Sequence, residues 1–102
     1  MTTEMRAYHF IGIGGAGMSV IASILAAAGH RVSGSDKVES KVLEDLRAQG
    51  IDAHAGHGKE DFPEDATVVL SSAIREDNPE LVTARQRQQT IVHRSQALAQ
   101  AA

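Results

Sequence analysis

The feature that most constrains this chain is residues 9–19 (HFIGIGGAGMS), where an apolar run breaks into glycines and gives way to a helical pattern. Its glycines at positions 12, 14 and 17 fit the G-x-G-x-x-G spacing of a strand, a tight turn and a helix start. In this pattern the first glycine, Gly12, allows the tight turn. Gly14 allows a ligand's phosphates to approach the backbone closely, and Gly17 allows the helix to pack against the strand. Amides freed at such a helix start favour a diphosphate. The alternative is that the glycines serve only the turn and the packing.

The apolar patterns that follow alternate between strand and helix. We therefore expect an α/β fold, a Rossmann-like three-layer domain with a mainly parallel sheet of about five strands, and a single domain over residues 1–102. The expected strands are residues 7–13, 31–36, 51–54, 67–70 and 90–93. The expected helices are residues 18–28, a helix capped by Ser40 that ends at Gly50, a helix capped by Asn78 that runs to about residue 88, and a last turn at residues 96–99 capped by Ser95.

Composition excludes several classes of function. The chain has no cysteine, so it forms neither a disulfide nor a thiolate site. Its formal net charge of −3 argues against a nucleic-acid partner, and His54 and His57 lack the further ligand that a metal site needs. The first residues do not follow the order of a signal peptide, and no apolar run is long enough for a membrane span. We expect a cytoplasmic protein without a bound metal.

Polar residues follow several of the expected strands, and the carboxyl ends of parallel strands meet at one edge, where ligands bind. Asp36, after the second strand, either accepts hydrogen bonds from a ribose or base or only caps its turn. Ser71 and Ser72, after the fourth strand, lack the G-x-S-x-G context of a nucleophile, so we expect a polar loop that lines the pocket. The ATP-binding pattern G-x-x-x-x-G-K-[ST] is absent from the sequence.

Several segments together resemble one family, the N-terminal domain of the UDP-N-acetylmuramate L-alanine ligases, which are Mur ligases. The resemblance covers nearly the whole chain and is more specific than the glycine turn alone, because generic dinucleotide-binding domains are not expected to share its later segments. The matching segments are residues 9–19 (HFIGIGGAGMS), 32–36 (VSGSD), 56–57 (GH) and 71–80 (SSAIREDNPE).

The resemblance implies a role in bacterial peptidoglycan synthesis. Such ligases use ATP and magnesium to activate the lactyl carboxylate of UDP-N-acetylmuramate as an acyl phosphate, which the amine of L-alanine then attacks. This chain looks like the first of three domains, the one that holds the UDP-sugar. The ATP-binding central domain and the C-terminal domain would then be its partners, and the chain alone would have no catalytic residue and no cofactor of its own.

The resemblance also implies the site residues. The diphosphate is expected at Gly14, Gly15, Ala16, Gly17, Met18 and Ser19; the uridine is expected at Ser35, Asp36, His57, Ser72, Ala73 and Ile74, with Asn78 and Glu80 shaping that pocket. Three alternatives stay open: an NAD-binding domain of an oxidoreductase, the related ligase that recycles murein peptides, and a nucleotide-sensing module without an enzyme.

Overall fold

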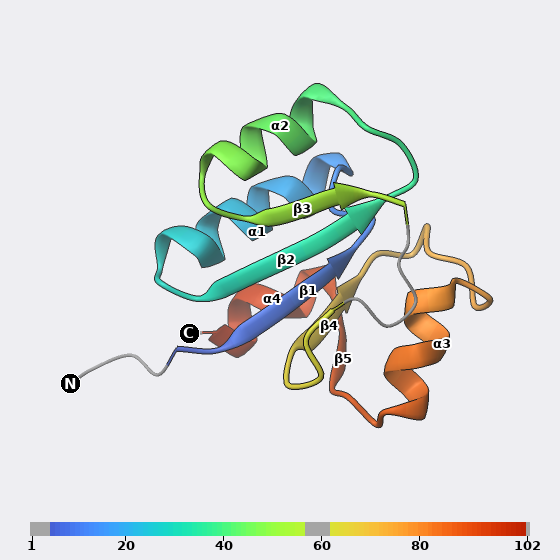
Figure 1. Ribbon diagram of the computed structural model, residues 1–102. Coiled ribbons are helices and arrows are strands. Elements are labelled where there is room, and N and C mark those ends of the chain that lie inside the picture. The colour runs from blue at the N-terminus through green and yellow to red at the C-terminus, as the bar shows by residue number, and fades with distance from the viewer. Residues whose placement is uncertain (1–4, 57–61, 102) are drawn as a thin grey trace.

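The computed structural model describes residues 5–56 and 62–101, and in this part of the chain strands and helices alternate (Figure 1). The elements are β1 (Ala7–Ile11), α1 (Ala16–Ala27), β2 (Arg31–Asp36), α2 (Lys41–Ala48), β3 (Asp52–Ala55), β4 (Thr67–Leu70), α3 (Pro79–Gln86), β5 (Ile91–His93) and α4 (Arg94–Ala101). Within the described ranges, none of these helices has the length and apolar character needed to cross a membrane.

The five strands form one parallel sheet in the order β3-β2-β1-β4-β5. From β1 the chain builds outward through β2 and β3, then returns to the other side of β1 to form β4 and β5. The carboxyl ends of β1, β2 and β4 therefore meet where the direction of winding reverses, which is the position at which open α/β sheets bind ligands. The expected Rossmann-like parallel sheet is confirmed.

Two apolar clusters cover the two faces of the sheet. Tyr8 and Phe10 point from β1 into a cluster with residues of α1, α2 and α4, whereas Ile11 points to the other face, where Leu81 of α3 packs. This alternation follows from the two-residue period of a strand. Because helices lie on both faces (Figure 1), β1 is buried along its whole length, as a central parallel strand should be.

Local sequence signals place most element ends correctly. Asn78 caps α3, because its Oδ1 accepts the Glu80 amide at 2.9 Å, and Ser40 caps α2. The expected cap at Ser95 is wrong. The helix α4 already begins at Arg94, and the Ser95 hydroxyl lies 2.9 Å from His93 Nδ1 instead.

The first strand is shorter than expected and ends at Ile11. Gly12 has a φ of +82°, which is the left-handed conformation that glycine adopts without strain. The amides of Gly12 and Ile13 both donate to the carbonyl oxygen of Ser35, at 2.8 and 2.9 Å. The backbone thus leaves the β-ladder at Gly12 and folds back over the end of β2.

Gly34 of β2 tests how tightly the sheet packs at this point. A β-carbon on Gly34 would lie 2.5 Å from Ile13 Cδ1 and 2.9 Å from the carbonyl oxygen of Phe10, closer than real contacts allow. We expect Gly34→Ala to lower the free energy of unfolding by about 1–3 kcal/mol, the usual cost of overpacking. Urea denaturation measures this. The control is Gly50→Ala, which has open space around the new methyl group and only a positive φ of +87°, and is therefore expected to be milder. Equal losses in the two variants would contradict the packing argument.

Candidate functional site

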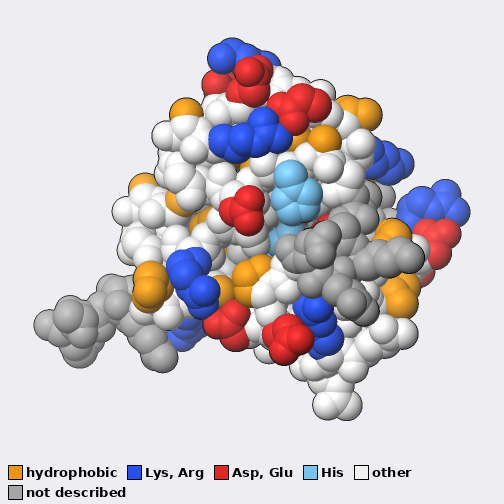
Figure 2. Space-filling model, viewed as in Figure 1, with side chains coloured by type: hydrophobic (Ala, Val, Ile, Leu, Met, Phe, Trp, Pro, Cys, Tyr) orange, Lys and Arg blue, Asp and Glu red, His pale blue; other side chains and the backbone are white. Residues whose placement is uncertain are grey.

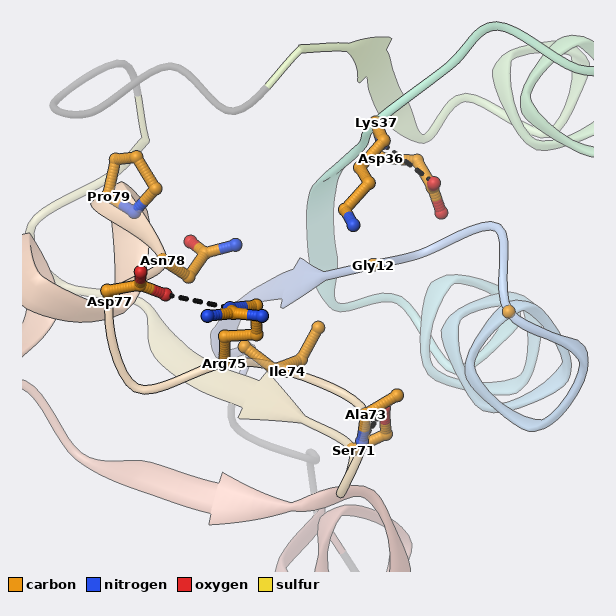
Figure 3. Close-up of a pocket in the computed structure, with 11 residues that line it drawn as sticks. Gly12, Asp36, Lys37, Ser71, Ala73, Ile74, Arg75, Asp77, Asn78 and Pro79 are labelled. Carbon is orange, nitrogen blue, oxygen red and sulfur yellow. Dashed lines mark hydrogen bonds and ion pairs between the residues drawn. The ribbon is translucent and has the colours of Figure 1, made fainter.

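A pocket of about 530 Å³ opens at the carboxyl edge of β1, β2 and β4 (Figure 3). One wall is the glycine turn after β1, the second is the end of β2, and the third is the loop that leads from β4 into α3. The lining residues are Gly12, Gly15, Asp36, Lys37, Ser71, Ala73, Ile74, Arg75, Asp77, Asn78 and Pro79. The strand ends that sequence analysis expects to converge do so here.

The glycine wall of the pocket leads directly into α1. Gly15 occupies the N-cap position, no side chain caps the helix, and its first turn carries no acidic residue. In the described part of the chain, the first-turn amides of α1 therefore have no side-chain acceptor. Such amides, together with the positive end of the helix dipole, favour an anionic group.

Asp36 connects three segments at the end of β2. Its Oδ2 accepts the Gly14 amide at 2.8 Å, its Oδ1 accepts the Lys37 amide at 2.8 Å, and its carbonyl oxygen accepts the Gly56 amide at 2.6 Å. A β-carbon on Gly14 would lie 2.8 Å from Oδ2, so a side chain there would displace the carboxylate. Asp36 thus caps its turn and also lines the pocket, and its contact with a ribose or base stays a prediction.

The facing walls carry polar groups that point toward each other. In Figure 3 the Lys37 ammonium, from the end of β2, and the Asn78 amide, from the start of α3, extend into the pocket from opposite sides. Arg75 Nε lies 3.2 Å from Asp77 Oδ1 on the loop wall. Ile74, on the same loop, adds an apolar surface to this wall. The pocket therefore offers hydrogen-bond donors and apolar surface together.

An ion pair ties the loop wall to α3. The guanidinium of Arg85 in α3 donates a hydrogen bond to the Glu76 carboxylate. This hydrogen bond is the largest cause that lowers the pKa of Glu76 below its ordinary value, and it raises the pKa of Arg85. Both side chains are exposed, so the pair orients the loop more than it stabilises the fold.

A buried polar network lies beneath the pocket. Glu80 is 1% exposed, and its Oε1 lies 2.7 Å from His9 Nε2 and accepts the Ser35 hydroxyl at 2.7 Å. The other ring nitrogen of His9, Nδ1, lies 2.8 Å from Ser33 Oγ, and the ring stacks on Phe62 with 4.4 Å between centroids. A carboxylate buried this deeply is stable only when hydrogen bonds replace its water, and here they fix α3 to β1 and β2.

The structure brings together only some of the residues that the resemblance implies. Gly15, Asp36, Ala73, Ile74 and Asn78 line the pocket. Four others lie close by, in the glycine turn and the first turn of α1: Gly14, Ala16, Gly17 and Ser19. The side chains of Met18, Ser35 and Glu80 are buried. Ser72 borders a separate shallow hollow, and His57 lies outside the described residues.

Ser35 and Gly17 have surroundings that differ from those expected of them, whereas Glu80 was expected only to shape the pocket. Ser35 and Glu80 hydrogen-bond each other inside the protein, so their side chains support the pocket wall from within and do not line it. Gly17 does not serve helix–strand packing, because a β-carbon there would meet Arg94 Nη1 at 2.7 Å, on the side of α4.

Several residues that line the pocket were not predictable from motifs in the sequence. Lys37, Arg75, Asp77 and Pro79 were not expected individually at the site, and of the two serines expected in the lining loop only Ser71 lines the pocket. The available signal was position, because Lys37 directly follows Asp36 and the others belong to the loop after β4. That loop was expected at the ligand-binding edge.

A glycine turn, an uncapped helix start and a pocket at the reversal point of a parallel sheet define the class of Rossmann-like α/β domains. Residues 7–102 match the family model described as "Mur ligase family, catalytic domain". The chain therefore belongs to the Mur ligase family.

Individual relatives agree with this family. A UDP-N-acetylmuramate–L-alanine ligase from Streptomyces avermitilis is 57% identical over 100 residues, which cover 97% of this chain and 22% of that protein. The solved UDP-N-acetylmuramate-alanine ligase from Thermotoga maritima matches with a TM-score of 0.86 and 34% identity, over 95% of this chain and 22% of that one. A UDP-N-acetylmuramate:L-alanyl-gamma-D-glutamyl-meso-diaminopimelate ligase from Neisseria meningitides matches with a TM-score of 0.83 and 28% identity, over 95% of this chain and 31% of that one. The chain spans about a fifth of the length of the curated relatives it matches.

The buried network predicts a large effect of removing Glu80. We expect Glu80→Ala to lower the free energy of unfolding by about 3 kcal/mol, because it leaves His9 and Ser35 without their buried acceptor. Urea denaturation measures the loss. The control Asp45→Ala removes a carboxylate from the exposed pair with Lys41 and should change stability by about 0.5 kcal/mol or less. A loss in Glu80→Ala no larger than in the control would refute the role of the network.

The pair of Glu76 and Arg85 predicts a pH dependence of the loop. Since the pKa of Glu76 is lowered, the pair's contribution is present above the ordinary value of 4.5 and is lost as the pH falls through the lower pKa of the folded chain. NMR titration of the Glu76 carboxyl should give a midpoint below 4.5, and Arg85→Met should move it upward. An unchanged midpoint in that variant would show that Arg85 is not the cause.

Proposed function

We propose that this chain binds UDP-N-acetylmuramate as the N-terminal part of an ATP-dependent ligase that joins L-alanine to this nucleotide sugar in peptidoglycan synthesis. The observation that carries the proposal is the pocket at the carboxyl edge, where an uncapped helix start faces a polar and apolar loop. The similarity to ligases named for UDP-N-acetylmuramate and L-alanine supports the choice of ligand.

In this proposal the diphosphate binds at the start of α1. The first-turn amides supply fixed donors, and the turn at Gly12 and Gly14 lets the backbone approach the phosphates without side chains in the way. Lys37 adds a positive charge from the end of β2. These groups are in place before a ligand arrives, which lowers the entropy lost on binding.

The uridine binds along the loop wall. Ile74 and Pro79 offer apolar surface to the base, and the Asn78 amide, whose Oδ1 is used by the helix cap, has its NH₂ group left to donate to a uracil carbonyl. Asp36 is placed to accept from a ribose hydroxyl or the base through the capacity its carboxylate retains. The contacts of Gly15, Ala16, Gly17, Met18, Ser19, Ser72, Ala73 and His57 remain predictions that follow from the resemblance.

The chain holds the substrate and does not carry out the reaction. Its sequence lacks the G-x-x-x-x-G-K-[ST] pattern, so ATP and magnesium are expected to bind in the remaining length of the ligase. We further propose a cytoplasmic location, where UDP-sugars and ATP are both available.

A murein-peptide ligase is the second reading within the family, because the Neisseria meningitides structure also matches most of the chain. The choice of amine substrate would then differ while the nucleotide pocket kept the same task. An alternative function outside the ligases is that of an NAD-binding domain of an oxidoreductase. The two ligase readings predict UDP-ligand binding, and the last predicts NAD binding.

Calorimetric titration with UDP-N-acetylmuramate, UDP and NAD tests the proposal. We expect saturable binding of both UDP ligands and none of NAD. Gly14→Val should weaken UDP binding at least about tenfold, because the new side chain displaces Asp36 and enters the phosphate approach. The control Ala27→Val adds the same side chain at the far end of α1 and should bind as the unmodified chain does. Binding of NAD alone, or full UDP affinity in folded Gly14→Val, would contradict the proposal.

A further inference from the structure

Arg94, at the junction of β5 and α4, lies against the first turn of α1. A β-carbon built on Gly17 would be 2.7 Å from Arg94 Nη1 and 3.2 Å from its Cζ. The guanidinium therefore occupies the space that the missing side chain of Gly17 leaves free. This contact gives Gly17 a role that the G-x-G-x-x-G pattern alone does not suggest.

Arg94 is exposed to solvent at the start of α4. Across residues 5–56 and 62–101, no carboxylate lies within ion-pair distance of its guanidinium. The first turns of α1 and of α4 carry no acidic residue, so a cation lies beside two positive helix ends. Cations are unfavourable at helix N-termini. An arrangement of this kind becomes favourable when an anion binds between the positive groups.

The sheet order places this cation on the side opposite to Lys37. Lys37 follows β2, Arg94 follows β5, and the glycine turn after β1 lies between those strands in the order β3-β2-β1-β4-β5. A group held by the start of α1 would thus be flanked by one cation from each half of the sheet. Since guanidinium binds phosphate with paired, charge-assisted hydrogen bonds, Arg94 suits this place better than a lysine would.

We propose that Arg94 is a specificity-determining residue for the diphosphate. Position 17 is a glycine because any side chain there would keep the Arg94 guanidinium from reaching the diphosphate. This inference rests on the proposed function and extends it to a residue outside the pocket lining. Arg94 acts on the phosphates and not on the uridine, so its effect depends on the phosphate content of the ligand.

The test uses NMR titration to measure the affinities of the unmodified chain and its Arg94 variants for UDP and for uridine. NMR titration measures affinities into the millimolar range. Arg94→Ala should weaken UDP binding about tenfold and leave uridine binding within about twofold. Arg94→Lys keeps the charge but not the paired donors, so its affinity for UDP should lie between those of the unmodified chain and Arg94→Ala. The dependence of UDP affinity on salt should also become shallower in Arg94→Ala, because one cation is lost.

Two controls separate this role from a general effect of charge. Arg31→Ala removes an equal charge at the opposite edge of the sheet, where Arg31 pairs with Asp65, and should leave UDP binding unchanged. Gly17→Ala should weaken UDP binding by displacing the guanidinium, and should add little in a chain that already carries Arg94→Ala.

The outcomes distinguish the two proposals. UDP binding that is equal in the unmodified chain and in Arg94→Ala overturns the assignment of Arg94 and leaves the proposed function intact. Equal losses for UDP and uridine overturn it as well, because the residue would then act on the whole pocket. No binding of any UDP ligand by the unmodified, folded chain overturns both.

Discussion

The carboxylate of Glu80 is enclosed in the protein, 2.7 Å from His9 Nε2 and from the Ser35 hydroxyl. Removing a carboxylate from water is unfavourable unless hydrogen bonds replace the lost hydration. The two partners come from β1 and β2, and Glu80 itself lies in the first turn of α3. The network therefore joins three elements that are distant in sequence, and the position of α3 on the sheet depends on it.

The pocket inherits its shape from this junction. Ser35 donates its hydroxyl to Glu80, while its carbonyl oxygen accepts the amides of Gly12 and Ile13. Asp36, the next residue, holds the Gly14 amide. Two consecutive residues at the end of β2 thus fix the glycine turn on one side and the start of α3 on the other. The walls of the pocket are set by the folded chain, so the pocket is preorganised for a ligand.

How much could be predicted from the sequence depended on whether the cause was local. Gly12, Ser40 and Asn78 act within a few residues, so the turn and two helix caps were predictable. Glu80 was read as a pocket residue at a helix start, and its burial depends on His9, 71 positions away. The contact of Arg94 with Gly17 also requires the sheet order, which one sequence does not reveal. Local chemistry identified the edge of the sheet, and long-range packing decided which side chains reach it.

In the proposed function, one preorganised edge of the sheet binds the nucleotide sugar. Amide chemical shifts of the ¹⁵N-labelled chain, recorded during titration with UDP-N-acetylmuramate, test it most directly. We expect shifts concentrated in the glycine turn, at Asp36 and Lys37, and in residues 71–79, with little change around Gly50 and Asp52 at the opposite edge. Shifts centred on that opposite edge, or none at saturating ligand, would contradict it.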